Sequence, residues 1–207
     1  MSTRGSHKSI MNDSKATAGT VSGTTRQAHT EAQFKAAMDR CRQVFAAKLH
    51  DYGASWRMMR PSSLTDQLLI KARRIRSIEI KKTAMVNEGI LPEYIALVNY
   101  GIVGLIQLER GFADSIDMTP NEALALYDSH AGEALRLMTR KNHDYDEAWR
   151  AMRVSSYTDI ILTKLQRVKE IEDIGDSNIA SEGIDANYTD IINYAVFGVI
   201  RLTENGE

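Results

Sequence analysis

The sequence predicts an all-α fold, a helical bundle built from two tandem three-helix repeats that are related by a pseudo-two-fold axis. Apolar residues recur at helical spacing along most of the chain, and no stretch shows the strict alternation of a β-strand. Residues 48–79 return as residues 141–172, at an offset of 93 positions and with about half of the residues identical. One copy alone would expose a wide apolar face, so we expect both copies to pack into one domain.

The first repeat, residues 31–112, is expected to contribute three helices. Apolar positions predict a first helix over 31–51, capped by Gly53. After a connector, Ser-x-x-Asp at Ser63 resembles a capping box, and the helix that it opens ends near Lys82. Pro92 at a first helical position predicts a third helix over 93–110, apolar nearly all round and therefore buried. Residues 1–30 are rich in Ser, Thr, Gly, Ala and Lys, and we expect a disordered tail there.

The second repeat, residues 119–207, opens on the clearest helix start in the sequence. Thr119, Pro120 and Glu122 match the N-cap, the first helical residue and the N3 partner of a capping box. Helices are expected over 120–145, 157–174 and 186–204. We therefore predict a single all-α domain over residues 31–207.

Composition excludes several classes of protein. Lys and Arg number 26 against 27 Asp and Glu, which argues against bulk nucleic-acid binding. The single Cys41 permits no intrachain disulfide, and its place on an apolar face indicates a core residue. No signal-peptide-like run and no apolar stretch long enough to span a bilayer is recognised, so we expect a cytoplasmic protein without membrane contact. A homodimer stays open as an alternative.

The residues that the two copies share are mostly polar, which indicates a site or a buried polar network more than plain packing. Lys164 lies on the apolar arc of its helix with Arg167 at the margin, and Lys71 and Arg74 repeat this arrangement. A lysine at a core-facing position is costly unless it meets a carboxylate or an anionic ligand.

Asp190 is the expected carboxylate, on one stripe of an apolar helix with Asn193. Ala96 holds the matching position in the first copy, so a full site that uses Asp190 exists once in the chain. Two hypotheses follow: a satisfied buried network, or a pocket for a phosphorylated ligand. In the second case Asp190, Glu182 and Glu172 are the candidate catalytic residues and Mg²⁺ ligands.

Further nucleotide- or phosphate-binding candidates lie on or near the connectors, beside Ser-Ser helix starts that attract anions. They are Arg57, Arg60, Arg150, Arg153, Asp144 and Tyr145, and Tyr194 on the last helix is a further candidate. Trp56 and Trp149 either stack on a base or anchor each connector against the bundle.

The quoted residues resemble a known family. Both copies carry Lys-x-His-Asp-Tyr, Trp-Arg-x-Met-Arg, Ser-Ser, Thr-Asp and Lys-x-x-Arg, followed by Glu-Gly-Ile and, in the second copy, Asp190-x-x-Asn193-Tyr194. This pattern is similar to the two-repeat form of the nucleotide modification associated domain 1 family, whose name implies a role in nucleotide or modified-base metabolism.

The expected arrangement also looks like the MazG and dimeric dUTPase group of all-α nucleoside triphosphate pyrophosphatases. Those enzymes hold Mg²⁺ with Glu-x-x-Glu on one helix and Glu-x-x-Asp on a later one. Here Lys164-x-x-Arg167 stands at the first motif and Asp190-x-x-Asn193 at the second. Three hypotheses stay open: a Mg²⁺-dependent nucleoside triphosphate pyrophosphatase, a nucleotide- or phosphate-binding protein without chemistry, and a structural helical protein.

Overall fold

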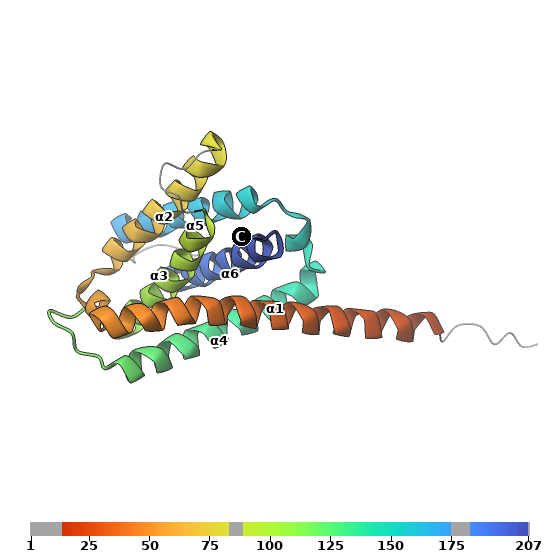
Figure 1. Ribbon diagram of the computed structural model, residues 1–207, viewed down its shortest axis with the longest axis horizontal. Helices are drawn as coiled ribbons and strands as arrows, with labels where there is room; N and C mark the ends of the chain where they lie inside the picture. Colours follow the sequence, from red (N-terminus) through yellow and green to blue (C-terminus); the bar gives the residue numbers. More distant parts are fainter. Residues whose placement is uncertain (1–13, 83–88, 175–182, 207) are drawn as a thin grey trace, which may run out of the picture.

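The computed structural model describes residues 14–82, 89–174 and 183–206, and in this part of the chain it is all-α (Figure 1). The first repeat contains α1 (Ser14–Tyr52), the short 3₁₀ helix η1 (Ser55–Met58), α2 (Pro61–Lys81) and α3 (Leu91–Arg110). The second contains α4 (Pro120–Tyr145), the 3₁₀ helix η2 (Ala148–Ala151), α5 (Val154–Ile174) and α6 (Ile184–Glu204). The predicted all-α bundle of two three-helix repeats is confirmed.

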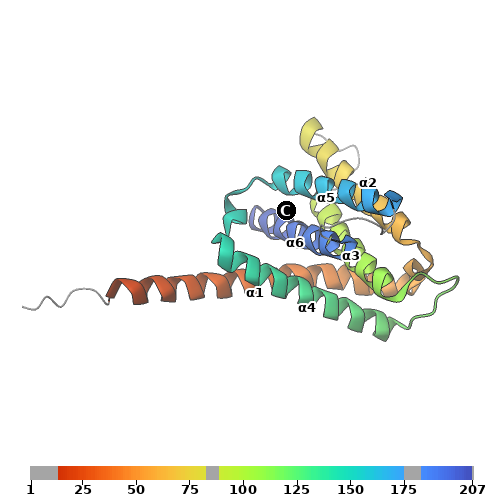
Figure 2. The same cartoon turned by 180° about the vertical axis from the view of Figure 1, so that it is seen from behind.

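The helices pair with their counterparts and form three layers. α1 lies beside α4, α3 crosses α6 in the middle layer, and α2 packs on α5, as the two opposite views show (Figures 1 and 2). α3 and α6 make the most extensive contact of the bundle, and each also packs on the second helix of its own repeat. Because each pair joins equivalent elements, the two repeats are related by a pseudo-two-fold axis through the crossing of α3 and α6.

The middle layer is buried because its helices are apolar nearly all round. Tyr94 and Tyr188 are fully buried, and each ring lies against a glycine of the opposite helix, Gly198 and Gly104 respectively. A β-carbon at Gly104 would come within 2.6 Å of the Tyr188 ring, so glycine is what allows this close crossing.

The helix ends confirm most of the predicted signals. The capping box at Thr119 is formed, with the Glu122 backbone N–H donating to Oγ1 of Thr119 and a Glu122 carboxylate oxygen accepting from the Thr119 N–H. Gly53 has a φ of +60° after the end of α1. The predicted capping box at Ser63 was wrong. α2 instead begins at Pro61, because proline fixes a helical φ at the first position and holds the preceding residue, Arg60, extended.

The predicted start of the first helix near residue 31 was also wrong, since α1 begins at Ser14. Residues 1–13 of the predicted tail lie outside the described residues. Thr30 is buried and donates a hydrogen bond to the Glu147 carboxylate, and Gln33 accepts one from Arg150 at 2.5 Å. These partners belong to the second repeat, so contacts that are distant in sequence support a segment whose composition alone predicts disorder.

One helix, α3, is long and apolar enough to cross a membrane by length and composition, which corrects the prediction that no such stretch exists. Within the bundle, 78% of its apolar window is buried. That degree of burial is typical of the central helix of a helical core.

Candidate ligand-binding site

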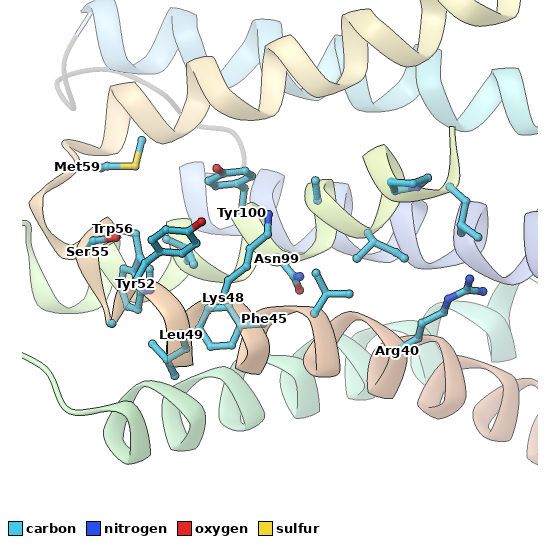
Figure 3. Close-up of a pocket in the computed structure, with 17 residues that line it drawn as sticks. Arg40, Phe45, Lys48, Leu49, Tyr52, Ser55, Trp56, Met59, Asn99 and Tyr100 are labelled. Carbon is cyan, nitrogen blue, oxygen red and sulfur yellow. The ribbon is translucent and has the colours of Figure 1, made fainter. Parts of the chain in front are cut away.

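A cavity of about 930 Å³ opens in the first repeat between α1, η1 and α3 (Figure 3). Its walls are mainly apolar and aromatic, and its polar groups come from a few side chains. The lining residues are Arg40, Val44, Phe45, Lys48, Leu49, Tyr52, Gly53, Ser55, Trp56, Met59, Leu91, Pro92, Ile95, Ala96, Asn99, Tyr100 and Val103. This size and composition are typical of small-molecule sites.

The charges of the cavity have one sign. Among the described residues of its lining, Lys48 and Arg40 are the cations, and none is an Asp or Glu. Lys48 extends from α1 toward Tyr100 of α3, while Trp56 lies at one end of the cavity and Arg40 at the other (Figure 3). Arg40 donates to Oγ1 of Thr203 at 3.1 Å, whereas Lys48 has no carboxylate partner among the described residues. The cavity therefore combines aromatic surface with uncompensated positive charge.

Asn99 is held in the wall of the cavity by two hydrogen bonds. Its amide nitrogen donates to the backbone oxygen of Cys41 at 3.0 Å, and Tyr127 donates its hydroxyl to the Asn99 amide oxygen at 2.8 Å. Burial raises the pKa of the Cys41 thiol to about 12, so this side chain stays neutral, as expected for a core residue.

The same place in the second repeat is filled by the protein itself. Counting from α3 to α6 at an offset of 94, Asp190 stands for Ala96 and Phe197 for Val103. Lys141 and Lys164 bind the Asp190 carboxylate at 2.5 and 2.8 Å. The Phe197 ring stacks on Trp149 with 4.3 Å between the ring centroids and 5° between the planes.

Both repeats contain the predicted lysine–carboxylate network. In the first repeat, however, the carboxylate lies one helical turn before the position that is equivalent to Asp190. In the second repeat Lys164 pairs with Asp190, as predicted. In the first repeat Lys71 pairs with Glu93 at 3.2 Å, and Arg74 binds the same carboxylate. Lys164, Lys71 and Arg74 therefore have protein partners in the structure.

Arg57 and Arg150 hold in place the connectors that contain η1 and η2. Arg57 is 3% exposed and bonds with Asp117 at 2.8 Å, with Gln107 and with the backbone oxygen of Gly111. Arg150 donates to Glu147 at 2.7 Å and lies over the Trp149 ring. A phosphate bound by Arg57 or Arg150, as the sequence predicts, would have to compete with these bonds.

The other predicted residues are spread over the second repeat and the connectors. Arg60 and Arg153 are exposed beside the starts of α2 and α5, and Asp144 and Tyr145 are exposed at the end of α4. Arg167 reaches Glu170 at 3.3 Å.

Asn193 and Tyr194 lie on α6 between Asp190 and Phe197, the two residues that fill the cavity position in the second repeat. Tyr194 meets the Phe197 ring edge-on at a centroid distance of 6.2 Å. Both amide atoms of Asn193 are buried and lack a partner within the described residues. Its counterpart Asn99 has Tyr127 as a partner, whereas Phe34 stands at the equivalent position for Asn193.

Two of the three expected metal ligands, Glu172 and Asp190, have different polar partners. Glu172 accepts from the Thr65 hydroxyl at 2.7 Å, whereas Asp190 is engaged by its two lysines, and Glu182 lies outside the described residues. Over the ranges that are described, no group of three His, Cys, Asp or Glu side chains converges. The Mg²⁺ site stays a prediction.

A second polar network joins the repeats across the pseudo-two-fold axis. Thr65 bonds with Glu172 and with the Tyr188 hydroxyl, at 2.7 Å each. The equivalent Thr158 bonds with Glu79 at 3.0 Å and with the Tyr94 hydroxyl at 2.8 Å. Burial raises the pKa of both glutamates and raises that of Tyr188 to about 12.

The catalytic and metal candidates predicted from the sequence lie in the second repeat and the phosphate-binding candidates in both, whereas the cavity of the first repeat is lined by none of them. Ala96 was interpreted as the loss of a carboxylate, yet the same substitution removes the partner of Lys48. The signal that identifies the cavity is the pair of small residues, Ala96 and Val103, where α6 carries Asp190 and Phe197.

Fold and cavity together define an all-α, two-repeat protein with an open small-molecule cavity in its first repeat and a filled counterpart in its second. The model of the nucleotide modification associated domain 1 family matches residues 48–108 and 141–202, once in each repeat. The chain belongs to this family. No curated protein and no solved structure matches the chain, so the likeness to MazG-type enzymes is not confirmed.

Proposed function

We propose that the protein binds a nucleotide in the cavity of the first repeat. The observation that carries this proposal is a cavity of about 930 Å³ that is lined by Trp56 and Tyr100 and contains Lys48 and Arg40, with no acidic side chain among the lining residues that the structure describes. Aromatic rings stack on planar bases, and basic side chains in a partly apolar cavity bind phosphate strongly. The family description, nucleotide modification associated, supports the same class of ligand.

Binding is favoured over hydrolysis because, in the described part of the chain, no carboxylate that could hold Mg²⁺ lines this cavity. Asp190 already balances Lys141 and Lys164, and Glu172 bonds with Thr65 on another face of the bundle. Pyrophosphate cleavage at Asp190, Glu172 and Glu182 is the alternative, and it requires the metal to displace these bonds.

The test is calorimetric titration of the full chain with ribo- and deoxynucleotides, each with and without Mg²⁺, together with an assay for pyrophosphate release. Lys48→Met removes the unpaired cation of the cavity. Lys35→Met removes an exposed lysine of the same helix that does not line the cavity, and it serves as the matched control.

We expect nucleotide binding that Mg²⁺ does not require, weakened at least about tenfold by Lys48→Met and unchanged by Lys35→Met. Absence of binding by any nucleotide, or an equal loss in both variants, would overturn the proposal. Pyrophosphate release that depends on Mg²⁺ and on Asp190 would favour the hydrolase alternative.

A further inference from the structure

We infer that the filled second repeat displays the binding pose of the ligand in the first repeat: a base stacked on Trp56, and a chain of two or more phosphates that runs past Lys48. This inference rests on the proposed nucleotide binding and deepens it, because it identifies the ligand as a nucleoside di- or triphosphate. Phe197 takes the place of the base and Asp190 takes the place of a phosphate.

The correspondence between α3 and α6 is supported by contacts as well as by sequence. At the offset of 94 the buried pair Tyr94 and Tyr188 correspond, and each ring packs on the glycine of the other helix at an equivalent position. Each tyrosine hydroxyl also bonds with the equivalent threonine of the opposite repeat. Positions on α6 can therefore be transferred to α3 residue by residue.

The ring position follows from the two tryptophans. Trp149 is 5% exposed because the Phe197 ring covers its face in a nearly parallel stack. Trp56 is only partly buried, lines the cavity, and has Val103 where Phe197 would stand. A planar ring that enters the cavity can thus adopt on Trp56 the stacked geometry that Phe197 adopts on Trp149.

The anion position follows from the lysines. Lys141 and Lys164 share the Asp190 carboxylate, whereas in the first repeat Lys71 has Glu93, and Lys48 lines an open cavity together with Ala96, the counterpart of Asp190. A phosphate oxygen near Ala96 would give Lys48 the anionic partner that Lys141 already has.

The length of the ligand follows from the spacing of these two positions. Asp190 and Phe197 are seven residues apart on one face of α6, which places their α-carbons about 10.5 Å apart along the helix axis. One ribose and one phosphate do not span that separation, so at least a second phosphate is needed. Arg40 lies beyond Lys48 at the end of the cavity opposite Trp56, where it can meet the distal phosphate (Figure 3).

The experiment uses tryptophan fluorescence, because Trp56 and Trp149 are the two tryptophans of the chain. Trp149→Phe and Trp56→Phe each leave one reporter. The full-length variants are titrated with the nucleoside, monophosphate, diphosphate and triphosphate of the base that binds best. We expect base stacking to quench fluorescence in Trp149→Phe and to leave Trp56→Phe unquenched. The diphosphate should bind at least tenfold more tightly than the monophosphate.

Two substitutions transfer the filled arrangement to the first repeat. Val103→Phe places a ring against Trp56, and we expect it to weaken every ligand at least a hundredfold. Ala96→Asp supplies Lys48 with a carboxylate, and we expect it to weaken the di- and triphosphate at least tenfold more than the neutral nucleoside. Ala125→Asp adds the same charge at an exposed position of α4 outside the cavity and should change nothing. Circular dichroism and thermal unfolding verify that each variant is folded.

The possible failures separate the two proposals. If the wild-type protein binds no nucleotide, the proposed function itself is overturned. If it binds nucleotides but folded Val103→Phe and Ala96→Asp bind them equally well, or if Trp149 is the quenched tryptophan, the pose is overturned and the binding lies elsewhere. If the monophosphate binds as tightly as the diphosphate, the assignment of a polyphosphate is wrong.

Discussion

The two repeats share their helices and the threonine–glutamate bonds that join them, but they differ at the cavity, which is open in the first repeat and filled in the second. Thr65 with Glu172 and Thr158 with Glu79 form equivalent bonds across the pseudo-two-fold axis. Trp56 and Trp149 occupy equivalent connectors, yet only Trp149 is covered by a stacked ring. The residues that both copies retain therefore hold the bundle together, whereas the positions where the copies differ decide which repeat can accept a ligand.

This comparison changes the meaning of the shared polar residues. Their identity indicated either a site or a buried network, and most of them contribute to a network: Arg57 and Arg150 bind their connectors, and the threonines link the repeats. Thr65 and Thr158 make equivalent bonds on the two sides of the pseudo-two-fold axis, which gives both copies a structural use for the same residue.

The largest effect is expected from removing the carboxylate that fills the second repeat. Asp190→Ala removes the carboxylate that both Lys164 and Lys141 bind at a buried position, since Asp190 is only 6% exposed. Partial exposure of the lysines moderates the loss, so we expect the free energy of unfolding to fall by about 3 kcal/mol. Urea unfolding followed by circular dichroism measures it.

The control is an ion pair of similar geometry on the surface. Arg42 and Asp128 meet at 2.6 Å, but their side chains are 39% and 50% exposed. Asp128→Ala should therefore cost about 0.5 kcal/mol. Equal losses in the two variants would mean that the filled position contributes no more than a surface pair does.

The crossing of α3 and α6 tests the symmetry of the fold itself. Gly104→Ala and Gly198→Ala each place a methyl group against a buried tyrosine ring, so each should lower the free energy of unfolding by about 2 kcal/mol. Because the two positions are equivalent, the losses should agree to within about 0.5 kcal/mol. Thermal and urea unfolding of both variants give the comparison.

A glycine outside the crossing should respond with the opposite sign. A β-carbon at Gly132 on α4 would meet only the mobile end of the Arg136 side chain, at 3.4 Å. Gly132→Ala should therefore stabilise the helix by about 0.5 to 1 kcal/mol. Unequal losses at Gly104 and Gly198 would show that the repeats depart from two-fold packing at their centre.

Sequence sufficed for the helices because their signals are local. Thr119, Pro120 and Glu122 define a helix start within four residues, and the apolar periodicity of α3 and α6 indicates burial whatever they pack on. The start of α1 was missed because its support comes from Glu147 and Arg150, more than a hundred residues away.

The candidate site was predictable only in part. The sequence indicated that Lys164 needs a carboxylate and identified Asp190, and the structure contains that pair. It did not reveal that Glu93 serves Lys71, because this carboxylate lies one turn away from the position equivalent to Asp190. Whether Val103 leaves a cavity or a closed core depends on how far apart α1, η1 and α3 pack. No local sequence pattern encodes the distance between these helices.

The buried amides provide a third comparison, of intermediate size. Tyr127→Phe removes the donor to the Asn99 amide oxygen, and we expect a loss of about 1 to 2 kcal/mol in the free energy of unfolding. At the equivalent place in the second repeat, Phe34→Tyr offers Asn193 a hydroxyl that it lacks, and a gain of up to about 1 kcal/mol should follow. Urea unfolding measures both. A loss in both variants would show that the space around Asn193 is not equivalent to that around Asn99.

The smallest effect concerns pH and the two half-buried glutamates of the interface. Burial raises the pKa of Glu79 and of Glu172 above the ordinary value of 4.5, although a threonine hydroxyl bond opposes each shift. Between the ordinary and the raised pKa the folded protein binds more protons than the unfolded chain does. The free energy of unfolding must therefore decline as the pH rises through this window.

Glutamine in place of either glutamate should flatten that decline, because its amide oxygen still accepts the threonine hydroxyl while the side chain stays neutral. Urea midpoints measured in steps upward from pH 4.5 test this for Glu79→Gln, Glu172→Gln and the double variant. Glu170 is exposed on α5, the helix that carries Glu172, and Glu170→Gln controls for the loss of one negative charge. The pseudo-two-fold arrangement requires that the two single variants reduce the pH dependence of the free energy of unfolding equally, and that their effects add in the double variant. A decline that persists in the double variant would place its origin outside this network.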